Sequence, residues 1–96
     1  MDKEFFQPLI DKACELLNLN KVILFGSWAR GDQSEKSDID LAFDFDEGQW
    51  IEFKLWVDEH FTTLREIDLV DLHKVDQDIL ASIEAEGVIL YAKQNH

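Results

Sequence analysis

Five residues of this chain have the types and spacing of a site that handles phosphate. Gly26 and Ser27 follow the apolar run KVILF, and ten residues separate Ser27 from Asp38. Asp38 and Asp40 alternate with apolar residues in DIDLAFDF, and Asp68 repeats this pattern in EIDLV. Because unpaired carboxylates are costly to bury in a strand, these acids require a partner of opposite charge.

The carboxylates of Asp38, Asp40 and Asp68 are predicted to bind divalent metal ions. Residues two apart in a strand lie about 6.6 Å apart on one face of the sheet, so the first two can converge. With Asp68 on a neighbouring strand, three carboxylates would share a small volume and repel one another. Oxygen ligands without a suitably spaced His or Cys favour Mg²⁺, or else Mn²⁺. Two such ions about 3.5–4 Å apart are the usual arrangement for phosphoryl chemistry, so a two-ion site is expected.

The third acid of this site has two alternatives, Glu66 and Asp71, which lie on either side of Asp68. Alternation along EIDLV predicts that Asp71 faces the helices, on the other side of the sheet from Asp68. Glu66 lies two residues further from the C-terminal end of the strand. Strand periodicity therefore favours Asp68.

Gly26, Ser27 and Arg30 are predicted to bind the phosphates of a nucleotide. Gly26 allows close approach of the backbone, and Ser27 begins a short helix. The Ser27 hydroxyl and the first N–H groups of that helix suit an anion. Arg30, one turn further on, is placed for a bidentate phosphate contact, with a surface salt bridge as the alternative. Acids that bind metal beside such a turn indicate a nucleoside triphosphate site.

The elements that position these residues follow from the hydrophobic periodicity of the chain. The predicted helices cover about 6–17, 27–30, 49–62 and 76–86. The predicted strands cover 21–25, 38–45, 66–70 and 88–91, with Asn18 to Asn20 as a break before the first. This order predicts one α/β (α+β) domain over 1–96, a small mixed sheet with helices packed on one main face.

Charge and composition exclude several classes of ligand. Nine basic and 21 acidic residues give a net charge of −12, which repels nucleic-acid polymers and anionic membranes and suits a basic protein partner. The single Cys14, the absence of a signal-peptide pattern and the lack of an apolar run of about 20 residues predict a cytoplasmic protein.

The stretch GSWARGDQSEKSDID resembles the signature Gly-Ser, ten residues, Asp-x-Asp of the polymerase-beta-like nucleotidyltransferase superfamily. The motifs GSxARG and SDIDL resemble those of its minimal nucleotidyltransferases (MNT), and the similarity extends along the chain from KVILFGS to EGVILY. The resemblance implies the palm fold and transfer of a nucleoside monophosphate, AMP from ATP, to a hydroxyl with release of pyrophosphate. It implies that Gly26 and Ser27 bind the triphosphate, that Asp38 and Asp40 hold the metals, and that Asp68 completes the site and helps to deprotonate the acceptor.

The resemblance also implies a protein partner, a small helical protein of the HEPN class. Such pairs resemble toxin–antitoxin systems in which the nucleotidyltransferase is the antitoxin, in some cases by adenylylating the toxin. The acidity of the chain fits docking onto a basic surface. The alternative function is a non-catalytic, nucleotide-binding antitoxin that inhibits its partner by complex formation. Modification of a small molecule is a third possibility, but it requires a substrate domain for which this chain has no room.

Overall fold

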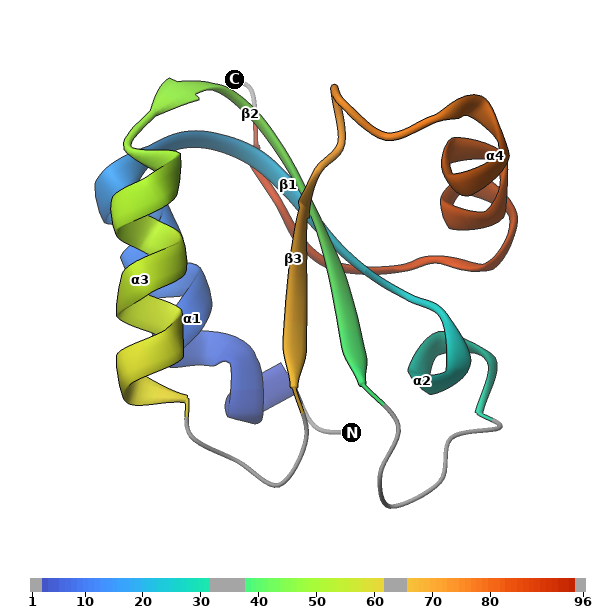
Figure 1. Cartoon of the computed structure of the whole chain (residues 1–96), viewed down its shortest axis with the longest axis horizontal. Helices are drawn as coiled ribbons and strands as arrows, with labels where there is room; N and C mark the ends of the chain where they lie inside the picture. The colour runs from blue at the N-terminus through green and yellow to red at the C-terminus, as the bar shows by residue number, and fades with distance from the viewer. Residues whose placement is uncertain (1–2, 32–37, 62–65, 95–96) are drawn as a thin grey trace.

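A computed structural model of the chain describes residues 3–31, 38–61 and 66–94, which form a mixed sheet with helices on both sides (Figure 1). The strands are β1 (Leu17–Phe25), β2 (Ile39–Gly48), β3 (Ile67–Asp71) and β4 (Val88–Ala92). The helices are α1 (Lys3–Leu16), α2 (Ser27–Arg30), α3 (Trp50–His60) and α4 (Gln77–Glu86). Across the sheet the order is β3-β2-β1-β4, with β1 antiparallel to β2 and β4, and β2 parallel to β3. The predicted mixed sheet is therefore confirmed.

The main core lies between the sheet and the two long helices. α1 and α3 lie together on one side of the sheet in Figure 1. Alternate residues of β1 and β2 point toward these helices, and burial of each large apolar side chain contributes roughly 1.5–3 kcal/mol. The fully buried members of this core are Phe6, Leu9, Ala13, Val22, Ile39, Leu41, Phe43 and Phe53.

A smaller core lies on the opposite face of the sheet, under α4. It consists of Ile23, Ala42 and Ile83, with Val70 and Leu72 packed against it. The main face thus holds the two long helices, as predicted, whereas α4 packs on the other side, the side to which Asp40 also points. Periodicity shows that a helix has an apolar stripe, but it does not show which face of the sheet that stripe will cover.

The first strand differs from its predicted bounds, because β1 begins at Leu17 and includes the expected break from Asn18 to Asn20. Leu17 and Leu19 are buried and pair with the end of β2, at Gly48 and Phe45. Shifts in the register on either side of Leu19 allow the asparagines to fit in the strand as an irregularity. Cross-strand pairing therefore overrides the turn preference of asparagine. The expected end of the second long helix, at 62, lies outside the described residues.

The helices in the described ranges are too short to cross a membrane. The longest is α1, with 14 residues, whereas a span requires about 20.

Candidate active site

Asp40 and Asp68 lie side by side on the parallel strands β2 and β3. The register pairs them directly, between the pairs Ile39–Ile67 and Leu41–Leu69. Ile39 and Leu41 are fully buried in the main core, so the two acids between these pairs project from the opposite face of the sheet. The structure thus places together two of the three acids that the sequence singles out, and it places Asp68 rather than Asp71 beside Asp40, because Asp71 pairs with Phe43.

The surroundings of Asp40 favour its protonated form. Its pKa is raised from 3.8 to about 6, chiefly because burial removes water from the carboxylate. The negative charges of Asp68 and Asp38 and a hydrogen bond with Asp68 add to this increase, whereas the positive charge of Arg30 opposes it. Burial acts on Asp40 in particular, because Asp40 is half-buried. A carboxyl group with a pKa so close to neutrality is typical of functional sites.

Asp38 is the least constrained of the three acids. It precedes β2 and is exposed, although it lies close enough for its charge to raise the pKa of Asp40. Within the described ranges, no group of three or more His, Cys, Asp or Glu side chains is arranged to hold a metal ion. The predicted three-ligand set is therefore not assembled in the described part of this structure, and both mutual repulsion and hydration favour separation of the exposed Asp38 carboxylate from the other two. The donor chemistry does fit a metal, since Asp40 and Asp68 offer only the oxygen atoms that Mg²⁺ prefers.

The Gly26–Ser27 bend packs against the Asp40 carboxylate. Phe25 pairs with Asp40 across β1 and β2, so the chain turns immediately beside this acid. Gly26 has φ +77° and ψ −155°, a backbone region that is essentially restricted to glycine. A Cβ atom added to Gly26 would overlap Oδ2 of Asp40. The lack of a side chain at Gly26 is thus required for the bend to lie this close to the Asp40 carboxylate.

The short helix α2 begins at this bend and carries Ser27 and Arg30. The N–H groups of Ala29 and Arg30 both donate to the Gly26 carbonyl, at 3.1 Å. Of the backbone donors expected to face an anion, these two are engaged within the turn. Ser27 is half-buried and begins α2 directly after Gly26.

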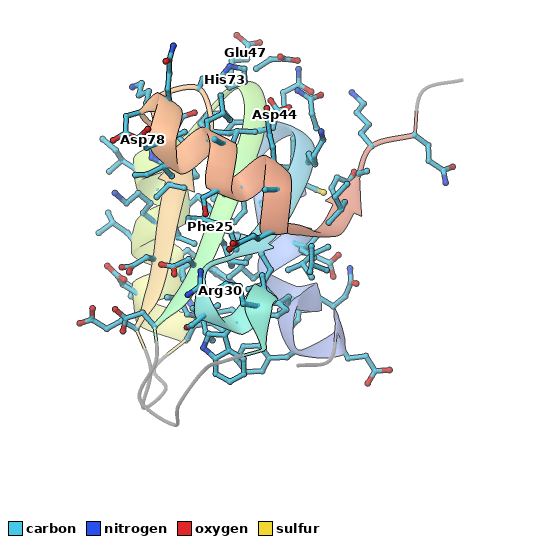
Figure 2. The ribbon with its side chains drawn as sticks, turned by 90° about the vertical axis from the view of Figure 1, so that its right-hand side faces the viewer. Phe25, Arg30, Asp44, Glu47, His73 and Asp78 are labelled. Atoms are coloured by element: carbon cyan, nitrogen blue, oxygen red, sulfur yellow. The ribbon has the colours of Figure 1, made fainter. Side chains whose placement is uncertain are left out.

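Arg30 reaches from α2 toward the end of α4 (Figure 2), where its Nη1 lies 3.2 Å from Oε2 of Glu86. The salt bridge weighed from sequence is therefore present, and the guanidinium charge also acts on Asp40. Sequence reasoning missed Glu86. One signal was available, because an acidic residue in the last turn of a helix is unfavourable to the helix dipole unless a cation lies nearby.

A second polar pair occupies the other end of this face of the sheet. Nε2 of His73 lies 2.8 Å from Oδ1 of Asp44, and this contact raises the pKa of the histidine. Figure 2 shows both residues far from Arg30. The pair links β2 to the turn after β3, where the Asp71 carboxylate accepts the His73 backbone N–H. Its position indicates a structural role, separate from the Asp40–Asp68 pair.

Residues 7–96 match the family described as polymerase beta, nucleotidyltransferase. The fold is thus that of a nucleotidyltransferase domain, and the chain belongs to this family. Its members generally use divalent metal ions. The predicted superfamily is confirmed.

Individual relatives agree with this assignment. A Methanocaldococcus jannaschii protein, whose name places it among candidate protein adenylyltransferases, is 42% identical over 40 residues, which is 42% of this chain and 40% of that relative. The fold is similar to a crystal structure described as a toxin–antitoxin with AMP-PNP, with a TM-score of 0.76 and 23% identity over 98% of this chain and 76% of that one. It is also similar to a chain in the complex of tri-AMPylated Shewanella oneidensis HEPN toxin with MNT antitoxin, with a TM-score of 0.66 and 21% identity. The match covers 96% of this chain and 74% of that one.

The raised pKa of Asp40 predicts an unusual pH dependence of stability in the metal-free protein. Between pH 3.8 and about 6 the folded state binds more protons than the unfolded state, so the free energy of unfolding falls as the pH rises. Because Asp40 is only half-buried, we discount the full shift for solvent screening and expect a loss of about 1 kcal/mol. Asp40→Asn should therefore raise the melting temperature at neutral pH by about 4–8 °C in EDTA, and the difference should vanish near pH 4.

Thermal melts of both proteins from pH 3.5 to 8 test this expectation. The matched control is Asp58→Asn, which removes an exposed carboxylate from α3, on the other side of the sheet. Equal melting temperatures of the wild type and Asp40→Asn across this range would show that Asp40 ionises without penalty in the folded state.

Proposed function

We propose that this chain transfers AMP from ATP to a hydroxyl group of a HEPN-type helical partner, with Mg²⁺ as the metal, and so acts as the antitoxin of a toxin–antitoxin pair. The observation that carries this proposal is the Asp40–Asp68 pair, which adjoins the glycine bend in a member of the nucleotidyltransferase family. The similarities to a candidate protein adenylyltransferase and to MNT–HEPN structures support the choice of nucleotide and partner.

In this proposal Asp38, Asp40 and Asp68 hold the divalent ions, which neutralise charge on the triphosphate when they are bound. Ser27 and Arg30 bind and orient the phosphate groups at the bend. The acceptor oxygen forms a bond to the α-phosphorus, the bond from that phosphorus to pyrophosphate breaks, and pyrophosphate leaves with the electron pair. Asp68 accepts the proton of the acceptor hydroxyl, a role that suits an exposed carboxylate beside the reacting atoms.

The direct test is incubation of the chain with ATP labelled at the α-phosphate, Mg²⁺ and the HEPN-type protein encoded beside it. Intact-mass analysis should show the addition of AMP to the partner, with Mn²⁺ as a substitute metal. A stable complex that gains no mass would instead support the alternative function, an antitoxin that acts by binding alone.

A thermal shift tests the nucleotide site without any partner. A ligand that binds only the folded state at 100 times its dissociation constant adds about 2.7 kcal/mol to the free energy of unfolding. For a domain of this size we therefore expect Mg²⁺ with ATP to raise the melting temperature by roughly 10–20 °C. ATP with EDTA is the control and should give a much smaller shift. An equal rise of the melting temperature in both mixtures would show that ATP binds without Mg²⁺, which contradicts the proposed role of the metal.

A further inference from the structure

The outward side of α3 carries a second apolar stripe. Trp50, Phe53 and Val57 face the core, yet Ile51 and Leu55 on the opposite side of the helix are 73% and 57% exposed. α3 lies at the margin of the molecule in Figure 1, and the described elements leave this side uncovered. A helix with apolar residues on both sides is typical of one that is buried on both sides. The second stripe therefore indicates a surface that another molecule covers.

Two adjoining hollows flank this stripe. One, of about 330 Å³, lies between α1 and α3 and is lined by Leu16, Leu55 and Trp56, with Glu52 and Glu59. The other, of about 440 Å³, includes Ile51 and again Glu52, so the two hollows meet at this residue. We call this surface the α3 groove. Ile51 and Leu55 are one turn apart, the spacing at which a partner helix inserts its own apolar side chains.

Four charged residues line the two hollows: Glu52 and Glu59 on α3, and the lysines Lys12 and Lys74. Glu52 and Glu59 lie two turns apart, about 10.5 Å along the helix axis. The lysine in the first hollow, Lys12, forms an ion pair with Glu15 and lies 5.8 Å from the centre of the Trp56 ring. With a net charge of −12 on the chain, a second copy would bring like charges together, whereas a basic partner would be attracted.

We propose that the α3 groove binds a basic amphipathic helix of a protein partner. Apolar side chains of that helix pack on Ile51 and Leu55, and its Lys or Arg side chains pair with Glu52 and Glu59. The groove lies on the opposite face of the sheet from Asp40 and Asp68, so its occupant leaves the acidic pair accessible. The inference rests on the proposed function only for the identity of the partner, a HEPN-type helical protein.

Leu55→Asp tests the apolar part of the groove, with the HEPN-type protein encoded beside this chain as the probe. We expect the dissociation constant, measured by titration calorimetry, to rise at least tenfold. Ile79→Asp is the matched control, because Ile79 is also exposed and helical but lies on α4, and it should change the constant less than twofold. Melting curves of both variants should show that the fold is retained.

Glu59→Gln tests the charged part of the groove. We expect weaker binding and a smaller loss of affinity with added salt, whereas Glu84→Gln on α4 should change neither. Wild-type affinity in Leu55→Asp, or no binding of the probe by the wild type, would overturn the inference. A wild-type dimer in light scattering that Leu55→Asp dissociates would overturn it in favour of a second copy.

The same variants separate this inference from the proposed function. Leu55→Asp should keep the thermal shift with Mg²⁺ and ATP, because the acidic pair is on the other face. Loss of that shift in the wild type, with probe binding intact, would contradict the proposed function and leave the docking surface standing.

Discussion

Asp40→Asn is expected to lower the rate of AMP transfer at least ~10²-fold while the chain remains folded. The amide keeps the shape of the side chain but removes the charge that would hold a divalent ion beside Asp68. The side chain also lies at the centre of the site, since its carboxylate adjoins both Gly26 and Asp68. Single-turnover assays with labelled ATP and the partner protein would measure the loss.

Two further variants make this result specific. Asp58→Asn carries the same chemical change on α3 and should transfer AMP at the wild-type rate. Asp38→Asn should also lose transfer, although Asp38 is exposed and precedes β2. Near-normal transfer by Asp40→Asn would refute the metal assignment. Near-normal transfer by Asp38→Asn alone would restrict the ligands on β2 and β3 to Asp40 and Asp68.

The contrast between loss of activity and gain of stability is itself informative. The same substitution that removes catalysis should stabilise the metal-free fold, because it removes a carboxylate whose ionisation is opposed by burial and by Asp68. A purely structural acid would behave in the opposite way, since its removal would cost stability. The folded chain thus retains a destabilising group where the proposed chemistry requires it.

Alternation in both strands predicted that Asp40 and Asp68 lie on a polar face of the sheet, because it fixes the face to which each side chain points. That the two strands are neighbours, with Asp40 paired to Asp68, comes from the structure. The position of Asp38 was not predictable in this way. It precedes the first paired residue of β2, where hydration and repulsion rather than the sheet determine the direction of the side chain. Periodicity therefore locates side chains inside elements better than at their ends.

Contacts between segments that are distant along the chain could not be predicted from the sequence either. Arg30 and Glu86 are 56 residues apart, and they meet only because α4 packs on the same face of the sheet as Asp40. The face of the sheet on which α4 packs depends on the small apolar cluster of Ile23, Ala42 and Ile83. No local sequence pattern distinguishes this cluster from the main core. The same limit applies to β1, whose asparagines indicate a turn until the pairing with β2 is known.

Gly26→Ala is expected to lower AMP transfer at least ~10-fold and to destabilise the fold by about 1–3 kcal/mol. The added methyl group would overlap Oδ2 of Asp40, so the bend and the carboxylate could not both keep their positions. Gly31→Ala is a matched control, because Gly31 also has a positive φ, of +81°, but has open space where a Cβ would lie. In Gly31→Ala, the alanine in this left-handed conformation should lower the free energy of unfolding by about 1 kcal/mol, while the folded protein still transfers AMP.

The comparison of these two variants separates backbone strain from contact with the acid. Rates measured below the melting temperature of each variant, with Mg²⁺ and ATP at saturation, isolate the effect on transfer. If strain alone mattered, both variants would lose transfer in proportion to their loss of stability. If the bend positions the Asp40 carboxylate, Gly26→Ala loses transfer even where it is fully folded, and its thermal shift with Mg²⁺ and ATP shrinks as well. Equal transfer by the two variants would show that the glycine at the bend serves the turn and not the site.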